Sequence, residues 1–254
     1  MSNNCLVTKL KGTVSNPNLD GMGWMRIVSD ASEKDRTKHV YISCNADVDL
    51  QLLGGGTIKN TEDTDLGTST QILANTSADL YFQGTLIIKN KYAVTVLTAT
   101  TGYSTDFNKY MPYMESLSEF DFNVNNSLSS LSAFNNDSSL IYFRLVGTDD
   151  YRNMPGDVEN LPSSIKNLTL AGTNTTLNVE NLSHIVGLEN LYLYGLYVTA
   201  TGDMRNLMNS LHANGRVSGR LHYECNTPII NVDGSTSAGS FTVEFSAGGW
   251  SIVS

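Results

Sequence analysis

The side chains that could do chemistry are thinly scattered along this 254-residue chain. Its four histidines are His39, His184, His212 and His222. Only His222 has a potential soft metal ligand nearby, Cys225. A zinc site needs four protein ligands, or three and a water molecule, so this pair does not make one. We therefore expect no metal and no cofactor, and we interpret the histidines as surface or strand-packing residues.

Two further groups of residues suggest ligand chemistry but have the wrong spacing. Neither a Lys-Ser/Thr pair nor a helix pattern follows Gly54-Gly55-Gly56, which therefore indicates a hairpin turn rather than a phosphate-binding loop. The acidic residues between positions 47 and 65 are spaced unlike a calcium loop, and glycine is missing at its sixth position. These acidic residues are Asp47, Asp49, Glu62, Asp63 and Asp65. We expect no calcium site.

No catalytic motif stands out in the sequence. There is no G-x-S-x-G elbow, and no Cys-His pair or pair of carboxylates is distinguished from random placement. Because a glycosidase can place its two carboxylates anywhere in a β-rich chain, a glycan-degrading enzyme stays an alternative. The sequence favours a protein that is not an enzyme.

A hydrophobic signature, L-x-x-L-x-L, recurs through the second half of the chain and predicts the strands that position the polar residues. Its clear copies, spaced by 23, 25 and 23 residues, are Leu117-x-x-Phe120-x-Phe122, Leu140-x-x-Phe143-x-Leu145, Ile165-x-x-Leu168-x-Leu170 and Leu188-x-x-Leu191-x-Leu193. A looser copy centres on Leu221-x-Tyr223, and Val94-x-Val96, 26 residues upstream of Phe120 and Phe122, predicts a sixth, degenerate strand. Each copy predicts one short strand, whose apolar side is buried only when a neighbouring copy stacks on it.

In period, apolar spacing and the glycine that follows, this region resembles a leucine-rich repeat. The glycines lie two residues after the last apolar position, at Gly147, Gly172 and Gly195. The family's inward-pointing Asn is matched by Asn125 and Asn226, whereas Thr148, Thr173 and Leu196 stand in the middle copies. The resemblance implies a solenoid, and the incomplete Asn ladder predicts an irregular one.

The segments between the predicted strands have helical spacing. Residues 203–215 predict an amphipathic helix, with Asp203 as its cap and Asn214-Gly215 as its stop. Its apolar positions are Met204, Leu207, Met208 and Leu211. Shorter helical segments are predicted by Leu128, Leu131 and Phe134, and by Val179, Leu182 and Val186.

The exposed face of the predicted strands is the one constellation of interest. In a parallel stack, the residue between the last two apolar positions points away from the core. This aligns Asp121, Arg144, Thr169 and Tyr192, preceded two residues earlier by Glu119, Tyr142, Asn167 and Asn190, and followed two residues later by Asn123, Val146, Ala171 and Tyr194. The candidate binding residues are Tyr142, Arg144, Tyr192, Tyr194 and Asp121, because tyrosines favour binding surfaces and Asp121 can pair with Arg144. An ordinary solvated strand face is the equal alternative.

The first domain contains a second repeat, because residues 41–60 align without a gap onto residues 71–90 with eight identities in twenty positions. Each copy predicts three strands separated by a polar turn and a glycine turn. Convergence of turn-rich strands is the alternative to duplication. Period-two spacing predicts further strands around Leu6-x-Thr8-x-Leu10, Trp24-x-Arg26-x-Val28 and Val40-x-Ile42-x-Cys44.

Together these patterns predict a β-rich, α+β protein. We expect an antiparallel β-sandwich over residues 1–91, an irregular leucine-rich-repeat solenoid over 92–232 and a C-terminal β-strand cap over 233–254. The three cysteines, Cys5, Cys44 and Cys225, are far apart, which indicates reduced structural thiols rather than a disulfide framework.

Charge and apolar content exclude several classes of partner. The net charge is -9, and residues 111–254 contain 6 basic and 14 acidic side chains. An acidic surface repels phosphate backbones and anionic lipids, so we expect neither nucleic-acid binding nor membrane insertion. No apolar run is long enough for a secretion signal or a membrane span, which favours a soluble protein made in the cytoplasm.

Two phrases resemble proteins of gut bacteria and their phages. Residues 161–168, LPSSIKNL, resemble repeats of gut Bacteroidetes, and residues 3–11, NNCLVTKLK, resemble the start of structural proteins of crAss-like phages. The resemblance implies a virion component, such as a head-fibre or tail-associated decoration protein. Its partners would be other virion proteins, further copies of itself and a host surface protein or glycan.

Three hypotheses follow. The first is a virion protein whose residues 1–91 dock or oligomerise and whose repeats face outward. The second is a recognition module of a gut bacterium that binds protein or glycan through the repeats. The third is the glycan-degrading enzyme.

Overall fold

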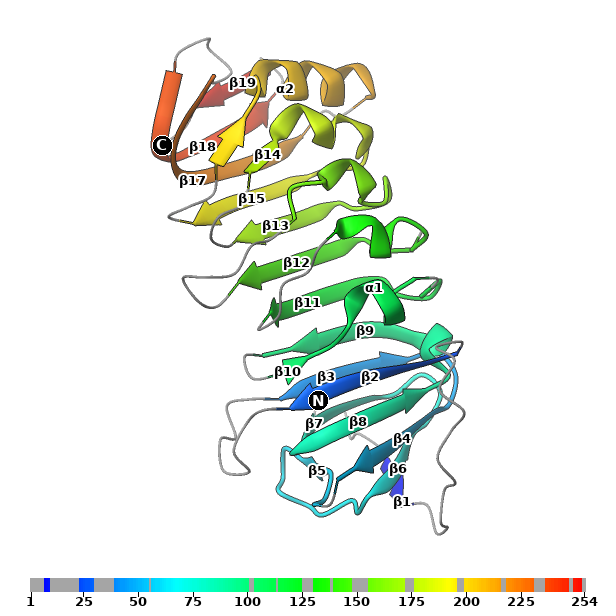
Figure 1. The fold of residues 1–254 in the computed structure, drawn as a ribbon. Coiled ribbons are helices and arrows are strands. Elements are labelled where there is room, and N and C mark those ends of the chain that lie inside the picture. The colour runs from blue at the N-terminus through cyan, green and yellow to red at the C-terminus, as the bar shows by residue number, and fades with distance from the viewer. Residues whose placement is uncertain are drawn as a thin grey trace. The chain divides into compact units, whose positions relative to one another are not determined.

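The structure is a computed structural model that describes fourteen segments of the chain (Figure 1). These are residues 7–9, 23–29, 39–54, 56–100, 103–112, 114–124, 130–137, 139–147, 155–171, 176–195, 199–215, 218–230, 236–246 and 249–252. The chain forms two compact units, Met1–Asn126 (unit 1) and Ser127–Ser254 (unit 2). The predicted boundary near residue 91 falls inside unit 1, and the one near residue 232 falls inside unit 2. The fold is β-rich, as predicted, with antiparallel and mixed sheets.

Unit 1 is built mainly from antiparallel strands. One sheet has the order β1-β6-β4-β8-β2-β10, and a second series of neighbours runs β9-β3-β7-β5. The strands are β1 (Val7–Lys9), β2 (Trp24–Ser29), β3 (Val40–Cys44), β4 (Val48–Leu53), β5 (Lys59–Asn60), β6 (Ser69–Ile72), β7 (Ser77–Tyr81), β8 (Gly84–Lys89), β9 (Val94–Ala99) and β10 (Tyr103–Ser104). A one-turn η1 (Lys91–Ala93), a short α1 (Phe107–Tyr110) and β11 (Glu119–Val124), which is parallel to β9, complete the unit.

The two copies of unit 1, residues 41–60 and 71–90, pair their strands reciprocally. The first strand of the first copy, β3, pairs with the second strand of the second copy, β7, and β4 pairs with β6 in the same way. The registers are equivalent, because Ile42 pairs with Ala78 while the matching residues Ile72 and Val48 pair with each other. All four side chains are at most 1 % exposed. Each copy therefore completes its apolar layer only with strands of the other.

A glycine with positive φ follows the second strand of both copies, directly after β4 at Gly54 and as the first residue of β8 at Gly84. Gly54 and Gly84, which occupy matching positions, have φ of +98° and +103°. Glycine reaches this left-handed region without the steric cost that a Cβ brings. The predicted turn at Gly54-Gly55-Gly56 is confirmed at Gly54 and at Gly56, whose φ is +95°, while Gly55 lies outside the described residues.

For two strands of unit 1, the sequence predicted the wrong positions for the buried or paired side chains along the strand. In β2 the buried side chains are Trp24 and the series Met25, Ile27 and Ser29, whereas Arg26 is exposed. The predicted strand at Val94-x-Val96 is confirmed as part of β9, but the residues of β9 that pair with Phe120 and Phe122 are Leu97 and Ala99. A register shift opposite Ser43 and Cys44 interrupts the alternation of β9, so Val94 and Leu97 are both buried although three residues separate them. The predicted alternation of Val40, Ile42 and Cys44 is confirmed by their burial, while Leu6 and Leu10 lie outside the described residues.

Unit 2 contains parallel strands at each of its predicted repeats. Strand β12 pairs with β13, β13 with β15 and β15 with β17, all parallel, and β18 and β19 follow antiparallel. The bounds are β12 (Tyr142–Gly147), β13 (Asn167–Ala171), β15 (Asn190–Gly195), β17 (Gly219–Ile230), β18 (Thr236–Ser246) and β19 (Gly249–Ile252). Two short parallel strands, β14 (Thr176–Asn178) and β16 (Thr199–Thr201), form a separate pair.

Short helical segments alternate with the strands of unit 2 (Figure 1). They are η2 (Leu131–Phe134), η3 (Val158–Asn160), η4 (Val179–His184) and α2 (Met204–Ala213). The predicted helix is confirmed in α2, where Asp203 accepts a hydrogen bond from the Arg205 amide at 2.9 Å and all four predicted apolar residues are buried. Val186 was wrongly assigned to an apolar face, because η4 ends at His184 and leaves Val186 44 % exposed. Leu128 lies outside the described residues.

Carboxylates join successive helical segments of unit 2. Asp157, just before η3, accepts hydrogen bonds from Ser130 Oγ at 2.6 Å and from the Leu131 amide at 3.0 Å, at the start of η2. Glu180 of η4 does the same for the start of α2, accepting from the Asp203 amide at 2.8 Å and from Asn206 Nδ2 at 3.0 Å. Backbone amides that no helix satisfies are thereby paired with the neighbouring repeat.

The side chains of the Asn ladder that the leucine-rich-repeat pattern predicts lie outside the part of the chain that the structure describes. Asn125, Thr148, Thr173 and Leu196 lie outside the described residues, as does the side chain of Asn226. Gly147 and Gly195 end β12 and β15, as predicted for a turn, while Gly172 is outside the described part.

The longest described helix, α2, has ten residues, and none of the described helices is long and apolar enough to cross a bilayer.

Candidate functional site

Strands β12, β13, β15 and β17, with β18 beside them, place alternate residues, most of them polar, in three rows in register, which we call the strand face. Row one contains Tyr142, Asn167, Asn190, Arg220 and Glu244; row two contains Arg144, Thr169, Tyr192, His222 and Thr242; row three contains Val146, Ala171, Tyr194, Glu224 and Ser240. The described residues between the rows, such as Phe143, Leu168 and Leu191, are at most 3 % exposed and form the core. Alternation within a strand therefore separates the strand face from the core.

Tyr192 and His222 form an aromatic pair in the middle of the strand face. They are register partners in β15 and β17, with ring centroids 5.0 Å apart and ring planes inclined by 38°. Tyr192 is 37 % exposed, and the His222 side chain is 19 % exposed. His222 Nδ1 lies 3.1 Å from Thr242 Oγ1, and His222 Nε2 lies 3.4 Å from Glu224 Oε2. These two contacts hold the imidazole beside the tyrosine ring.

Row one adds amide and charged groups beside this aromatic pair. Asn190 Nδ2 donates to Asn167 Oδ1 at 2.7 Å. Arg220 Nε lies 3.4 Å from Glu244 Oε1, with both side chains about half exposed. The strand face thus combines an aromatic platform, two linked amides and a charge pair that neutralises itself.

The structure brings four of the five predicted site residues into unit 2. Tyr142 and Arg144 are half-buried in β12, Tyr194 is half-buried in β15, and Tyr192 is exposed. Asp121 lies in β11 of unit 1. Its ion pair with Arg144 stays a prediction.

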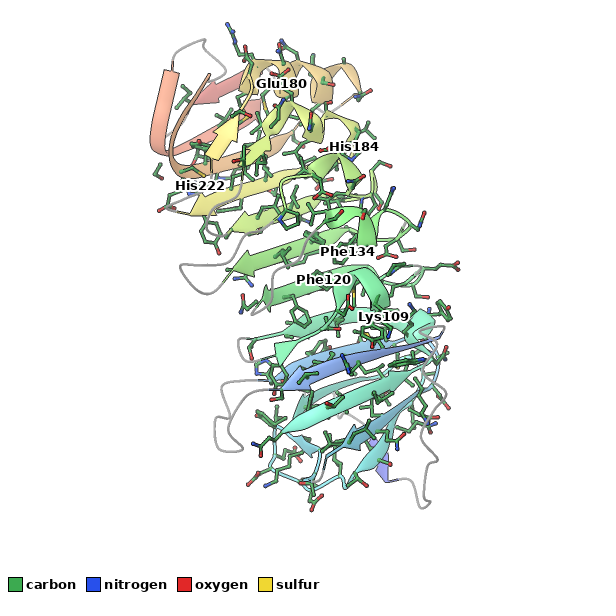
Figure 2. All side chains as sticks on the ribbon, viewed as in Figure 1. Lys109, Phe120, Phe134, Glu180, His184 and His222 are labelled. Atoms are coloured by element: carbon green, nitrogen blue, oxygen red, sulfur yellow. The ribbon has the colours of Figure 1, made fainter. Side chains whose placement is uncertain are left out.

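Sequence reasoning missed His222 as a member of the strand face. The signal was present, since His222 stands between Leu221 and Tyr223 and therefore occupies the same position as Tyr192 in the preceding repeat. Figure 2 shows His222 among the strands of unit 2, while Glu180 and His184 lie beside the helical segments. The partners Thr242, Glu224 and Glu244 were missed because no periodic pattern in the sequence indicates the pairing of β17 with the antiparallel β18 or the contacts within β17.

His222 and Cys225, which are close in the sequence, lie on opposite faces of β17. The two residues are three apart in a strand, so their side chains point to opposite faces, and Cys225 is 1 % exposed in the core. Burial raises the pKa of the Cys225 thiol to about 11. Among the described residues, no three His, Cys, Asp or Glu side chains gather where they could hold a metal ion.

The acidic residues of unit 1 serve its turns. Asp47 Oδ1 accepts from the Ala74 amide at 2.8 Å, and Asp65 Oδ1 accepts from the Gly67 amide at 2.7 Å. Asp49 Oδ1 accepts from Gln71 Nε2 at 2.8 Å across the β4–β6 pair. Asp47 and Asp65 therefore accept from backbone amides outside the strands, whereas Asp49 links two neighbouring strands.

A histidine and a carboxylate also approach each other in unit 1. His39 Nε2 lies 3.9 Å from Asp79 Oδ1, where burial raises the pKa of the Asp79 carboxyl and the charge of His39 opposes that rise. The described residues supply no nucleophile contact for this pair. The strand face of unit 2 is therefore the stronger candidate.

Chemically, the strand face can stack a flat ligand on Tyr192 and His222 and hydrogen-bond it through amides and carboxylates. No family model, no curated protein and no solved structure matches the chain. The geometry of the strand face therefore carries the functional argument.

Proposed function

We propose that this chain is a non-enzymatic binding and display protein whose unit 2 is a short, irregular leucine-rich-repeat solenoid. The observation that carries the proposal is the strand face, where four parallel strands in register align polar and aromatic side chains above an apolar core. Repeat solenoids use such extended faces to bind ligands. In this proposal β18 and β19 form the C-terminal cap, which covers the apolar edge of the last repeat.

Unit 1 has a docking or oligomerising role in the same proposal. Its antiparallel strands, with apolar side chains such as Ile42, Leu50 and Ile88 fully buried or nearly so, are consistent with a β-sandwich. Its reciprocal pairing of two copies makes it a rigid base. The repeats would then be displayed away from the surface to which unit 1 docks.

The setting we propose is a phage virion, in which the chain is a head fibre or a tail-associated decoration assembled in the host cytoplasm. The support is the resemblance of residues 3–11 and 161–168 to phage and gut-bacterial sequences. Mass spectrometry of purified particles is expected to find the protein at a fixed copy number. Its absence from the particles would remove the virion setting and leave the binding role untouched, in which case a recognition module of a gut bacterium takes its place.

The binding role is tested on the strand face itself. Replacing Tyr192 and Tyr194 together by Ala should abolish ligand binding without lowering the melting temperature, because both side chains are at least partly exposed. Unchanged binding by this variant contradicts the assignment of the strand face. Incubation with capsular polysaccharide is expected to release no reducing ends, and new ends would favour the enzyme alternative.

A further inference from the structure

The Tyr192–His222 pair forms an aromatic platform on the strand face. Two aromatic rings with centroids 5.0 Å apart present a broad π-surface, and His222 is held in place by Thr242 and Glu224. The faces of aromatic rings carry partial negative charge and attract groups with a partial positive edge. The C–H groups on one face of a pyranose ring have this character.

The neighbouring amides provide hydrogen bonding without net charge. An asparagine amide has two N–H donors and an oxygen with two lone pairs, so the single bond between Asn190 and Asn167 leaves further capacity on both side chains. Vicinal hydroxyl groups of a sugar both donate and accept, which matches amides placed side by side. Both asparagines lie one row from Tyr192. Asn190 is two residues before Tyr192 in β15, and Asn167 is two residues before Thr169, the register partner of Tyr192 in β13.

Charge and apolar content argue against other ligands. Arg220 is paired with Glu244 and His222 with Glu224, so these four side chains do not form a concentrated charge for a phosphate or a polyanion. Of the two aliphatic residues in the three rows, Ala171 is 2 % exposed, which leaves Val146. Protein interfaces usually have a fully buried apolar core, and the strand face offers little for one.

We propose that the strand face binds a neutral glycan, with a pyranose ring stacked on Tyr192 and His222 and its hydroxyls bonded to Asn167 and Asn190. This inference rests on the binding role proposed for the strand face. Glu224, whose side chain is 61 % exposed, stands one row from Tyr192 on the opposite side and adds a hydroxyl acceptor. The specificity is for uncharged sugars because neither sign of charge dominates the described side chains of the rows.

The test is affinity electrophoresis of the full chain in gels that contain mannan, dextran, galactan or xylan, with heparin as the polyanionic comparison. The expected result is retardation by at least one neutral polysaccharide and none by heparin. Tyr192→Ala should weaken the apparent Kd about tenfold or more, while Tyr192→Phe keeps the ring and stays within about threefold of the parent. Asn190→Ala should weaken binding by a smaller factor.

Tyr92 provides a matched control for the stacking residue. It is also 37 % exposed but belongs to unit 1, so Tyr92→Ala removes the same exposed ring from outside the strand face. This variant should migrate like the parent. Circular dichroism melting curves of all variants confirm that the fold is retained.

A peptide array probed in parallel separates the failure of this inference from the failure of the proposed function. Binding to peptides that is lost in Tyr192→Ala, with no retardation by any neutral polysaccharide, overturns the glycan inference and keeps the binding role. Retardation by a neutral polysaccharide that Tyr192→Ala leaves unchanged overturns the assignment to this platform. If neither the peptides nor the polysaccharides are bound, both proposals are overturned.

Discussion

The Asp157 carboxylate joins two repeats of unit 2 by accepting hydrogen bonds at the start of η2, and it also accepts one from within its own repeat. It accepts from Ser130 Oγ, from the Leu131 amide and from Asn160 Nδ2, the last at 2.8 Å. Burial acts to raise the pKa of this carboxyl, but the hydrogen bonds outweigh burial and hold the pKa below its usual value. A carboxyl whose pKa is lowered by folding stabilises the fold above about pH 4, and this contribution is lost as the pH falls.

We predict that Asp157→Asn lowers the free energy of unfolding by about 1–3 kcal/mol at pH 7, because one amide oxygen replaces two charged acceptors. The difference between parent and variant should be smaller at pH 3 than at pH 7, because the stabilisation that comes from the lowered pKa is lost progressively as the pH falls below about 4. Urea denaturation followed by Trp250 fluorescence in a Trp24→Phe background measures unit 2 alone, since the chain has these two tryptophans. Glu159→Gln, which keeps an acceptor for Asn181, is the control. An equal difference at both pH values would contradict the proposed role of the charge.

Cys225 allows a prediction at alkaline pH. Burial raises the pKa of its thiol to about 11 from the ordinary value of 9.0. Because the folded pKa is raised, the folded state loses stability relative to the unfolded state as the pH increases through roughly 9 to 11. At pH 8 the thiolate fraction in the folded protein should be about 100-fold lower than in urea. Iodoacetamide labelling, resolved by peptide mass spectrometry, should be slower in the folded state by at least that factor, and equal rates would show that the thiol is accessible.

At the scale of elements, the close stacking of repeats in unit 2 depends on a glycine. A Cβ added at Gly156 would lie 1.7 Å from the backbone oxygen of Thr176, which starts β14. At Gly187 the nearest atom to an added Cβ is the Ile165 oxygen at 3.5 Å, an ordinary contact distance. The two glycines therefore distinguish tight from relaxed packing between neighbouring repeats.

We predict that Gly156→Ala destabilises unit 2 by about 2 kcal/mol or more, because backbone atoms on both sides must move apart. Gly187→Ala should change the free energy of unfolding by less than about 1 kcal/mol. The same Trp250 measurement compares them. Similar values for the two variants would mean that the repeats are not as closely stacked at Gly156 as the structure indicates.

Gly54 and Gly84, the two matching glycines of unit 1, should lower the melting temperature by different amounts when each is replaced by Ala. Both Gly54 and Gly84 have positive φ, so an Ala at either position is strained by about 1–2 kcal/mol. A Cβ at Gly84 would also lie 2.9 Å from the Leu53 oxygen, whereas at Gly54 no atom lies within 4 Å. Gly84→Ala should therefore lower the melting temperature more than Gly54→Ala. Trp24 fluorescence in a Trp250→Phe background reports the difference, and the reverse order would contradict the geometry.

At the scale of the whole molecule, the division into two compact units predicts two unfolding transitions. Trp24 reports unit 1, where it is 5 % exposed, and Trp250 reports unit 2 through β19. Since each unit has its own apolar core, the transitions should have different urea midpoints when each tryptophan is followed alone. Coincident midpoints for both probes, with Asp157→Asn shifting both equally, would show a single cooperative unit instead.

Much of the local structure was predictable because it depends on neighbours in the sequence. The period of Met204, Leu207, Met208 and Leu211, with Asp203 before it, was sufficient for α2. The repeat spacing placed β12, β13, β15 and β17 and aligned Tyr192 with Thr169 in the observed register. The phase of β9 was missed because a register shift against β3 lies outside its own sequence.

The sequence by itself determined that unit 2 has repeated strands with one polar face, since the alternation of apolar and polar residues is a property of each strand. Only the tertiary structure decided which polar residues meet. His222 contacts Tyr192 from 30 positions earlier and Thr242 from 20 positions later, and the copies in unit 1 exchange strands rather than fold separately. Such contacts depend on which strands pair and in which direction, and those choices are made by burying apolar area across the whole unit rather than by any local pattern.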